Sequence, residues 1–220
     1  MAATNSTGRV TALHIGEPEA LGVEGAAAWY DDAWTTGIFK RPVTGPVAVG
    51  PLGLTGDGHA DLVNHGGTDK AICVYPSPHY AAWQAELGIA DFADGAFGEN
   101  ITLAGVTEAD VCIGDIVTIG DDLIAQVSQP RQPCWKLARK WRLKDLTARA
   151  VANGRTGWYL RVLRGGTIRV GDAVTRQERL HPAWTISAAN LVMHHRLGDS
   201  RALASLPELA GSWKKTLSSR

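Results

Sequence analysis

The sequence predicts a mainly β protein with α additions, in which a β-barrel is followed by a small helical domain. Short apolar segments recur between Gly-Asp turns at residues 114–115, 120–121 and 171–172. Short strands joined by such turns favour a barrel or a sandwich over alternating β–α units. The strand pattern ends near Gln177. We therefore expect a barrel domain over residues 1–178 and a three-helix domain over residues 179–220 that docks on it, because roughly 40 residues are too few for a stable separate fold.

Strands are expected where an apolar run is bounded by turn residues. Residues 113–121 and 123–129 are two such runs, and they are expected to pair as a hairpin. Residues 18–35 are rich in alanine and glycine without a clear period, so an irregular segment is expected there. The other expected strands are residues 11–15, 46–49, 71–75, 158–163 and 167–174.

Helices are expected at four or more places. Residues 77–78 (Ser-Pro) have the pattern of an N-cap followed by proline at N1, and Gly88 stands where that helix would end. Tyr80, Trp83 and Leu87 then share one apolar face, which indicates a structural helix. Helical spacing also covers residues 143–150.

The tail is expected to hold three short helices. Ser187 is predicted to cap the first, and residues 200–205 are predicted to form the second. Pro207 is predicted to lie near N1 of the third, whose apolar stripe is Leu209, Trp213 and Leu217.

Composition argues against several classes of function. The 220 residues carry 22 basic and 22 acidic side chains, so no global field favours nucleic acid or a membrane surface. From Arg179 onward six basic residues stand against two acidic ones, which we interpret as a solvated basic face. No run approaches the roughly 18 apolar residues of a membrane span, and residues 1–6 lack a signal-peptide pattern. Three cysteines without framework spacing indicate a reducing, cytoplasmic location.

The residues that carry chemistry centre on a corner at residues 128–136, Ser-Gln-Pro-Arg-Gln-Pro-Cys-Trp-Lys. Its two prolines each fix φ near about −65° and donate no backbone hydrogen bond, so an ordered, non-helical turn is expected. Cys134 lies there between the cations Arg131 and Lys136, and nearby positive charge favours the thiolate that attacks electrophiles or binds a metal. The alternative is a small apolar filler. Cys73 and Cys112 lie in apolar runs and are expected to pack in the core.

Residues 53–70 form the most polar and glycine-dense stretch. Backbone N–H groups around Gly66 and Gly67 can approach an anion, with Lys70 adding charge. Two alternatives stay open, a plain turn and a carboxylate–histidine metal site whose spacing matches no established signature. That metal site would use Asp57, His59, Asp61 and His65. Outside this stretch, Lys40, Arg41, Glu99 and Asn100 are either ligand contacts or parts of ordinary loops and caps.

The combined pattern resembles the MOSC domain family, specifically its YiiM-like bacterial members. The resemblance covers roughly residues 8–178, and the closing segment resembles the three-helix domain of YiiM-type proteins. Each motif alone is weak, but seven in family order are specific. They are residues 36–43 (TGIFKRPV), 53–57 (GLTGD), 65–71 (HGG and DKA), 97–100 (FGEN), 114–115 (GD), 129–136 (QPRQPCWK) and 156–159 (TGWY).

The resemblance implies a MOSC-type β-barrel, similar to the pyruvate kinase barrel, that holds the molybdenum cofactor. This cofactor is a molybdenum ion on a pterin dithiolene with a terminal phosphate. Cys134 would bind the metal as a thiolate, in agreement with the soft character of that ligand. The candidates for binding the phosphate are Lys40, Arg41, Lys70 and Arg131, and those for holding the pterin are His65, Gly66, Gly67 and Asn100.

The resemblance further implies two-electron reduction of N-hydroxylated compounds, such as hydroxylaminopurine, to amines. His65 joins Cys134 as a candidate catalytic residue, because the ordinary pKa of histidine suits a proton donor near neutral pH. The cofactor carries the redox chemistry while the protein positions it. The chain has no flavin, haem or iron–sulfur motif, so a separate reductase is expected to deliver electrons.

Two other functions stay open. In one, Cys134 carries a persulfide without pyridoxal phosphate and acts as a sulfur carrier, which explains the thiol and the cations but not the polar loops. In the other, the chain is a non-catalytic binding module whose basic tail contacts nucleic acid.

Overall fold

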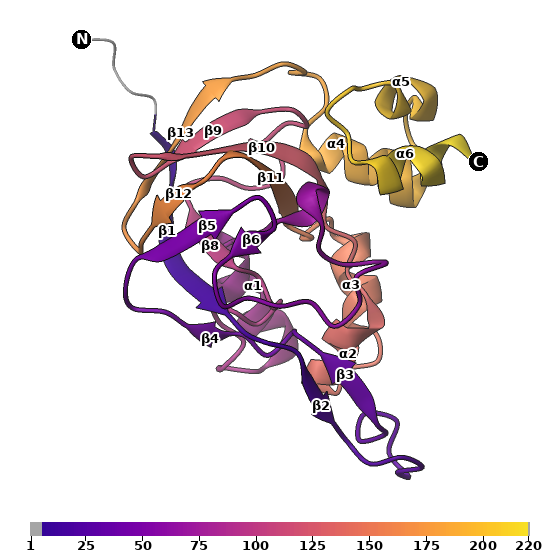
Figure 1. The fold of residues 1–220 in the computed structure, drawn as a ribbon. Coiled ribbons are helices and arrows are strands. Elements are labelled where there is room, and N and C mark those ends of the chain that lie inside the picture. The colour runs from indigo at the N-terminus through magenta and orange to yellow at the C-terminus, as the bar shows by residue number, and fades with distance from the viewer. Residues whose placement is uncertain (1–5, 220) are drawn as a thin grey trace.

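The structure, a computed structural model, describes residues 6–219 and contains a closed β-barrel with two groups of helices outside it (Figure 1). Seven strands form the ring in the order β13-β9-β10-β11-β7-β8-β1, and β13 pairs back to β1. The β7–β8 pair is parallel, and the other ring pairs are antiparallel. Closure gives every ring strand two neighbours, which removes the exposed edges of an open sheet. The ring strands are β1 (Ser6–Ile15), β7 (Ile72–Pro76), β8 (Ile101–Ala104), β9 (Ile116–Ile119), β10 (Leu123–Pro130), β11 (Trp158–Arg164) and β13 (Ala173–Glu178).

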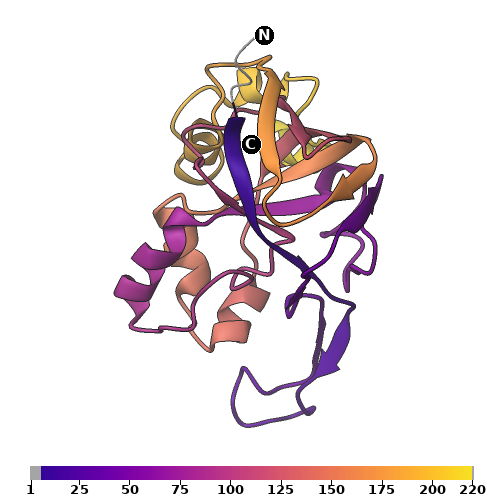
Figure 2. The ribbon, with the colours of Figure 1, turned by 90° about the vertical axis from the view of Figure 1, so that its left-hand side faces the viewer.

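Shorter strands extend the barrel. β4 (Arg41–Pro42) pairs with the end of β1, while β5 (Val47–Gly50), β6 (Gly53–Leu54) and β12 (Gly166–Ile168) form a small sheet of their own. β2 (Glu19–Leu21) and β3 (Trp34–Thr36) form a two-stranded ribbon that projects away from the barrel (Figures 1 and 2).

The ribbon corrects the expectation that residues 18–35 are irregular. Each strand has only three residues, which is too short to show a period, and the pairing partner lies about fifteen residues away along the chain. Pairing across such a loop leaves no local pattern in either segment.

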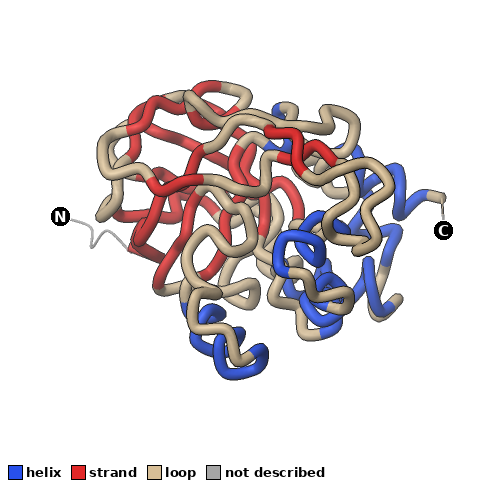
Figure 3. Tube along the Cα trace, turned by 90° about the horizontal axis from the view of Figure 1, so that it is seen from below, coloured by secondary structure: helices blue, strands red, loops and turns tan. Residues whose placement is uncertain are grey.

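The helices lie in two groups, one in the middle of the chain and one at its C-terminal end (Figure 2), and most of them gather on one side of the molecule when it is seen from below (Figure 3). The helices α1, α2 and α3 pack around an aromatic cluster that includes Tyr75, Trp83 and Phe97. The tail contains α4, which continues into the π-helix η2, followed by α5 and α6 (Figure 2). The bounds are α1 (Pro78–Leu87), α2 (Trp135–Trp141), α3 (Leu146–Ala152), α4 (Ile186–Asn190), η2 (Leu191–His195), α5 (Ser200–Ala204) and α6 (Gly211–Ser218), and a 3₁₀ turn η1 (Thr68–Lys70) precedes β7.

The predicted fold class, a β-barrel with C-terminal helices, is confirmed. The hairpin is confirmed as β9–β10, in which Leu123 faces Ile119. The helix that begins at Pro78 is confirmed as α1, and Gly88 ends it in the left-handed conformation (φ 68°). Ser77, however, makes no side-chain cap hydrogen bond.

Two tail predictions are wrong in detail. The first tail helix is capped by Thr185 instead of Ser187, because the Thr185 side chain accepts a hydrogen bond from the Ala188 N–H at 3.0 Å. The third helix begins at Gly211 instead of near Pro207, which lies in a turn. Ala210 donates its N–H to the Ser128 carbonyl at 2.9 Å, so the chain first runs along β10 and only then becomes helical.

The tail shares one hydrophobic core with the barrel. Leu203, Leu209 and Trp213 belong to the same buried cluster as Val127 of β10 and Ile113 before β9. β13 ends at Glu178, but because the core is continuous, a domain boundary at residue 178 stays a prediction. Within residues 6–219, no helix combines the length and the apolar character that crossing a membrane requires.

Truncating the central tail residue tests this shared core. Trp213 is 0% exposed, so Trp213→Ala should lower the free energy of unfolding by about 3–5 kcal/mol in denaturant titrations. Lys215→Ala, at an exposed position on the same helix, should change it by less than about 0.5 kcal/mol. A cost below about 1 kcal/mol for Trp213→Ala would show that the tail is only loosely attached.

Candidate functional site

A cavity of about 70 Å³ lies where the corner after β10 meets the glycine-rich loop, β7 and the turn before β8. Five of the residues predicted from the sequence line it, namely Cys134, His65, Arg131, Asn100 and Lys40. The remaining lining residues are Thr36, Gly37, Ile38, Gly58, His59, Ala60, Cys73, Gly98, Lys136 and Tyr159. Segments that are far apart in the chain therefore converge on one space.

Cys134 occupies the position just before α2. Its backbone is extended (φ −109°, ψ 170°), as the prolines of the corner predict. The Leu137 N–H and the Thr147 hydroxyl both donate to the Cys134 carbonyl at 3.0 Å, which fixes the backbone. The thiol is partly buried and lines both the cavity and a neighbouring hollow. Cys134 is thus held rigidly at a position that a ligand can reach.

Arg131 supplies a buried cation with an open donor. The residue is 6% exposed, its Nη2 donates to the Phe97 carbonyl at 2.5 Å, and its guanidinium lies 5.6 Å from the Phe97 ring centroid. Its buried Nη1 has no hydrogen-bond partner among the described residues. Because a guanidinium stays charged and an unpartnered buried donor is costly, this atom is the clearest sign of an anionic ligand.

His65 is uncharged at neutral pH in this structure. Burial, followed by the positive charges of Arg131, Lys136 and Lys70, lowers its pKa to about 4. The premise for a proton donor, an ordinary pKa near neutral pH, therefore does not hold in the cofactor-free protein. A bound anion would offset the neighbouring cations and raise the pKa of His65 again.

Lys40 and Asn100 are engaged in a network around Asp57. The Lys40 ammonium is paired with the Asp57 carboxylate in a nearly buried ion pair. Asn100 Nδ2 donates to Asp57 Oδ2 at 2.9 Å and to the His14 carbonyl at 3.3 Å, and Asn100 Oδ1 accepts from the Cys73 N–H at 3.0 Å. In this state both amide protons of Asn100 are used, and the charge of Lys40 is balanced by Asp57.

Four of the predicted site residues do not line the cavity. Arg41 is exposed on β4 and lines a surface depression outside the cavity. Lys70 Nζ donates to the Asn64 carbonyl at 2.6 Å and lines the neighbouring hollow. Gly66 and Gly67 both adopt φ 77°, and a Cβ on Gly66 would lie 3.0 Å from the His59 ring, so Gly66 makes room for that ring.

The alternative metal site does not form in this structure. Asp57 is held by Lys40 and Asn100, and Asp61 accepts hydrogen bonds from the Val63 and Asn64 N–H groups and the Asn64 side chain. Across residues 6–219 no group of three or more His, Cys, Asp or Glu residues is placed to hold a metal ion.

Of the ten lining residues that sequence reasoning did not assign to the site, four have titratable side chains, namely His59, Cys73, Lys136 and Tyr159. Lys136 was considered only as a flanking charge and His59 only as a metal ligand. Cys73 is buried as predicted, and burial raises its pKa, but it also lines the cavity. Cys73 faces Tyr159 across the β7–β11 pair, so knowledge of the strand register would have placed both.

A titration of His65 tests the electrostatics. The folded chain should leave His65 unprotonated between pH ~6.5 and about 4, whereas the unfolded chain protonates it there. This residue therefore makes the folded state less stable as the pH falls through that window. NMR should show a His65 pKa near 4, and Lys136→Gln should raise it by removing a nearby cation. A His65 pKa near 6.5 in the cofactor-free protein would contradict the geometry.

The comparisons with known proteins agree with the motifs. The family model of the MOSC domain matches residues 61–175. The chain is 39% identical over 208 residues to the uncharacterized protein YflK of Bacillus subtilis, covering 93% of this chain and 90% of that protein. It is 35% identical over 199 residues to protein YiiM of Escherichia coli, covering 87% of each. A protein named Reductase from Gibberella moniliformis is 38% identical over 177 residues, covering 80% of this chain but only 31% of that longer protein.

Solved structures lead to the same family. The crystal structure of YiiM from Geobacillus stearothermophilus matches with a TM-score of 0.79 and 39% identity, covering 96% of this chain and 98% of that one. The crystal structure of YiiM from Escherichia coli matches with a TM-score of 0.73 and 32% identity, covering 83% of this chain and 88% of that one. The chain therefore belongs to the MOSC domain family and is one of its YiiM-like members.

Proposed function

We propose that this protein is a molybdenum-cofactor-dependent oxidoreductase that reduces N-hydroxylated compounds to amines. The observation that carries the proposal is that the Cys134 thiol and the open Nη1 of Arg131 belong to residues lining one cavity. A thiolate suits a soft metal ion, and a guanidinium suits a phosphate. Family membership and the similarity to a protein named Reductase support an enzyme of this general class.

The donor set of the cavity fits the cofactor chemically. Beside Arg131, the Lys136 ammonium lines the cavity and has no hydrogen-bond acceptor among residues 6–219. The space of about 70 Å³ accommodates an anionic group such as a phosphate but not a whole pterin, since small-molecule sites span about 300–1,000 Å³. The lining residues therefore fit the metal and the phosphate of the cofactor, and the pterin itself would extend beyond this space.

The residues of this chain divide the work of binding and proton handling. When bound, the molybdenum cofactor supplies the two-electron chemistry that removes the hydroxyl oxygen from the substrate nitrogen. Each N–OH group consumes two electrons and two protons and yields an amine and water. Cys134 holds the metal, and Arg131 Nη1 binds the anionic end of the cofactor. His65 gives a proton on the substrate side once the bound anion has raised its pKa from about 4. Electrons come from a separate reductase, because the sequence has no flavin, haem or iron–sulfur motif.

Metal analysis tests the proposal directly. Protein produced in a host that makes the cofactor should contain molybdenum and pterin in stoichiometric amounts, and Cys134→Ala should lose most of the molybdenum. Cys112→Ala serves as the matched control, since Cys112 is buried elsewhere and does not line the cavity. Cyanide-labile sulfur on Cys134 without molybdenum would instead support the sulfur carrier.

The role of His65 has its own test. With molybdenum bound, His65→Ala should reduce turnover of an N-hydroxylated substrate by about 100-fold, the usual contribution of a positioned proton donor. The molybdenum content should stay at the wild-type level. Full turnover by this variant would rule out the proton-donor role.

A further inference from the structure

A second hollow, of about 390 Å³, adjoins the cavity on the other side of Cys134. The two spaces share four lining residues, His65, Cys134, Lys136 and Tyr159. Part of the hollow's wall comes from α6, which contributes Ser212 and Thr216. The C-terminal helices therefore reach the space beside the candidate metal ligand.

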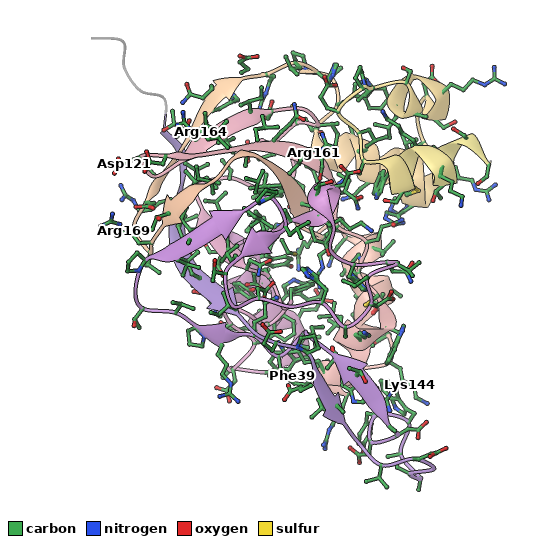
Figure 4. All side chains as sticks on the ribbon, in the orientation of Figure 1. Phe39, Asp121, Lys144, Arg161, Arg164 and Arg169 are labelled. Carbon is green, nitrogen blue, oxygen red and sulfur yellow. The ribbon has the colours of Figure 1, made fainter. Side chains whose placement is uncertain are left out.

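The position of α6 is fixed by contacts to the barrel. Asp69 Oδ2 accepts the Gly211 N–H at 3.0 Å, and Asp69 Oδ1 is held by Arg161 Nη2 at 2.6 Å. Arg161 lies where β11 meets the tail helices (Figure 4). The Ala210 N–H donates to the Ser128 carbonyl on β10, the strand that leads into the Cys134 corner. The α6 wall and the thiol are thus held by the same strand.

The hydroxyl groups of this wall have a defined polarity. Ser212 Oγ donates to Gln129 Oε1 at 3.1 Å, and Gln129 Nε2 donates to the Pro130 carbonyl, which fixes the orientation of the amide. Thr216 Oγ1 donates to the Ser212 carbonyl at 3.0 Å. Each hydroxyl has only one proton to give, so toward a ligand both groups act as acceptors.

The part of the hollow shared with the cavity has the opposite polarity. The Lys136 ammonium has only donors, and they are not used by a described residue. Trp135 also lines the hollow and is 53% exposed, which offers an aromatic surface. A ligand that matches these walls is a planar ring with N–H donors at one edge and an oxygen acceptor at another.

We propose that this hollow is the substrate subsite and that Ser212 and Thr216 select substrates with N–H donors. The inference rests on the proposed function, because it places the N-hydroxyl oxygen on the Lys136 and Cys134 side and the ring edge on the α6 side. A volume of about 390 Å³ lies in the range of small-molecule sites. The C-terminal helices thereby become part of the specificity apparatus.

The test compares two N-hydroxylated substrates in the double variant Ser212→Ala/Thr216→Val. N-hydroxycytosine has ring N–H donors, whereas N-phenylhydroxylamine has none on its ring. The variant should raise KM for N-hydroxycytosine by about 3- to 10-fold, the loss of one or two hydrogen bonds, with kcat within about twofold. KM for N-phenylhydroxylamine should stay within about twofold. Ser218→Ala is the control, since this exposed residue lies on the same helix outside the hollow.

A binding measurement makes the result independent of the redox reaction. The Kd of N-hydroxycytosine for the cofactor-free protein should rise by the same factor in the double variant. An unchanged ratio of the two KM values, or an unchanged Kd, would overturn the inference. A loss of molybdenum or pterin from the double variant would also overturn it, because the hollow would then hold the cofactor.

If the double variant does not fold, the Ser212→Ala variant alone decides the test, since Ser212 is exposed. Wild-type protein without molybdenum would contradict the proposed function only, because the Kd comparison still tests the hollow.

Discussion

The site depends on one buried guanidinium. Arg131 directly follows β10; its backbone N–H donates to the Gly157 carbonyl, and one side-chain nitrogen donates to the Phe97 carbonyl. The free energy needed to bury a cation is recovered only when its hydrogen bonds are satisfied, and Nη1 is not satisfied within residues 6–219. Burial, followed by the positive charge of Arg131 and its neighbours, lowers the pKa of His65 and keeps it unprotonated. The cavity is therefore built for an anion, and the partly buried thiol of Cys134 lies beside it.

A second junction connects that cavity to the tail. Asp69 lies in the turn before β7, and its carboxylate and carbonyl contact β11, α6 and the Ser128 hydroxyl on β10. β10 thus carries the docking point of the tail and, a few residues later, the corner that holds Cys134. The tail and the strand that leads to the site therefore share one buried core. This arrangement explains why a small helical appendage can contribute to binding without a core of its own.

Local patterns were sufficient for the features that depend on local physics. Alternating apolar residues around a Gly-Asp turn predicted the β9–β10 hairpin, and two prolines predicted the extended backbone at Cys134. Motif order predicted the barrel with its helical tail. What failed depends on distant partners. Lys40 and Arg41 are adjacent in sequence, yet only the folded structure, in which Lys40 pairs with Asp57, shows that Lys40 lines the cavity while Arg41 is exposed. Cys73 has the sequence surroundings of a core residue, and its place in the cavity follows from the pairing of β7 with β11.

The central claim is that the Cys134 sulfur is a ligand of molybdenum, and X-ray absorption at the molybdenum edge tests it most directly. Protein loaded in a host that makes the cofactor should show one more sulfur ligand on molybdenum than the molybdenum that remains in the Cys134→Ala variant. Replacing Arg131, which we assign to the phosphate, should lower the amount of cofactor retained without changing the number of sulfur ligands on molybdenum. Identical sulfur coordination in the wild-type and Cys134→Ala proteins would contradict the account.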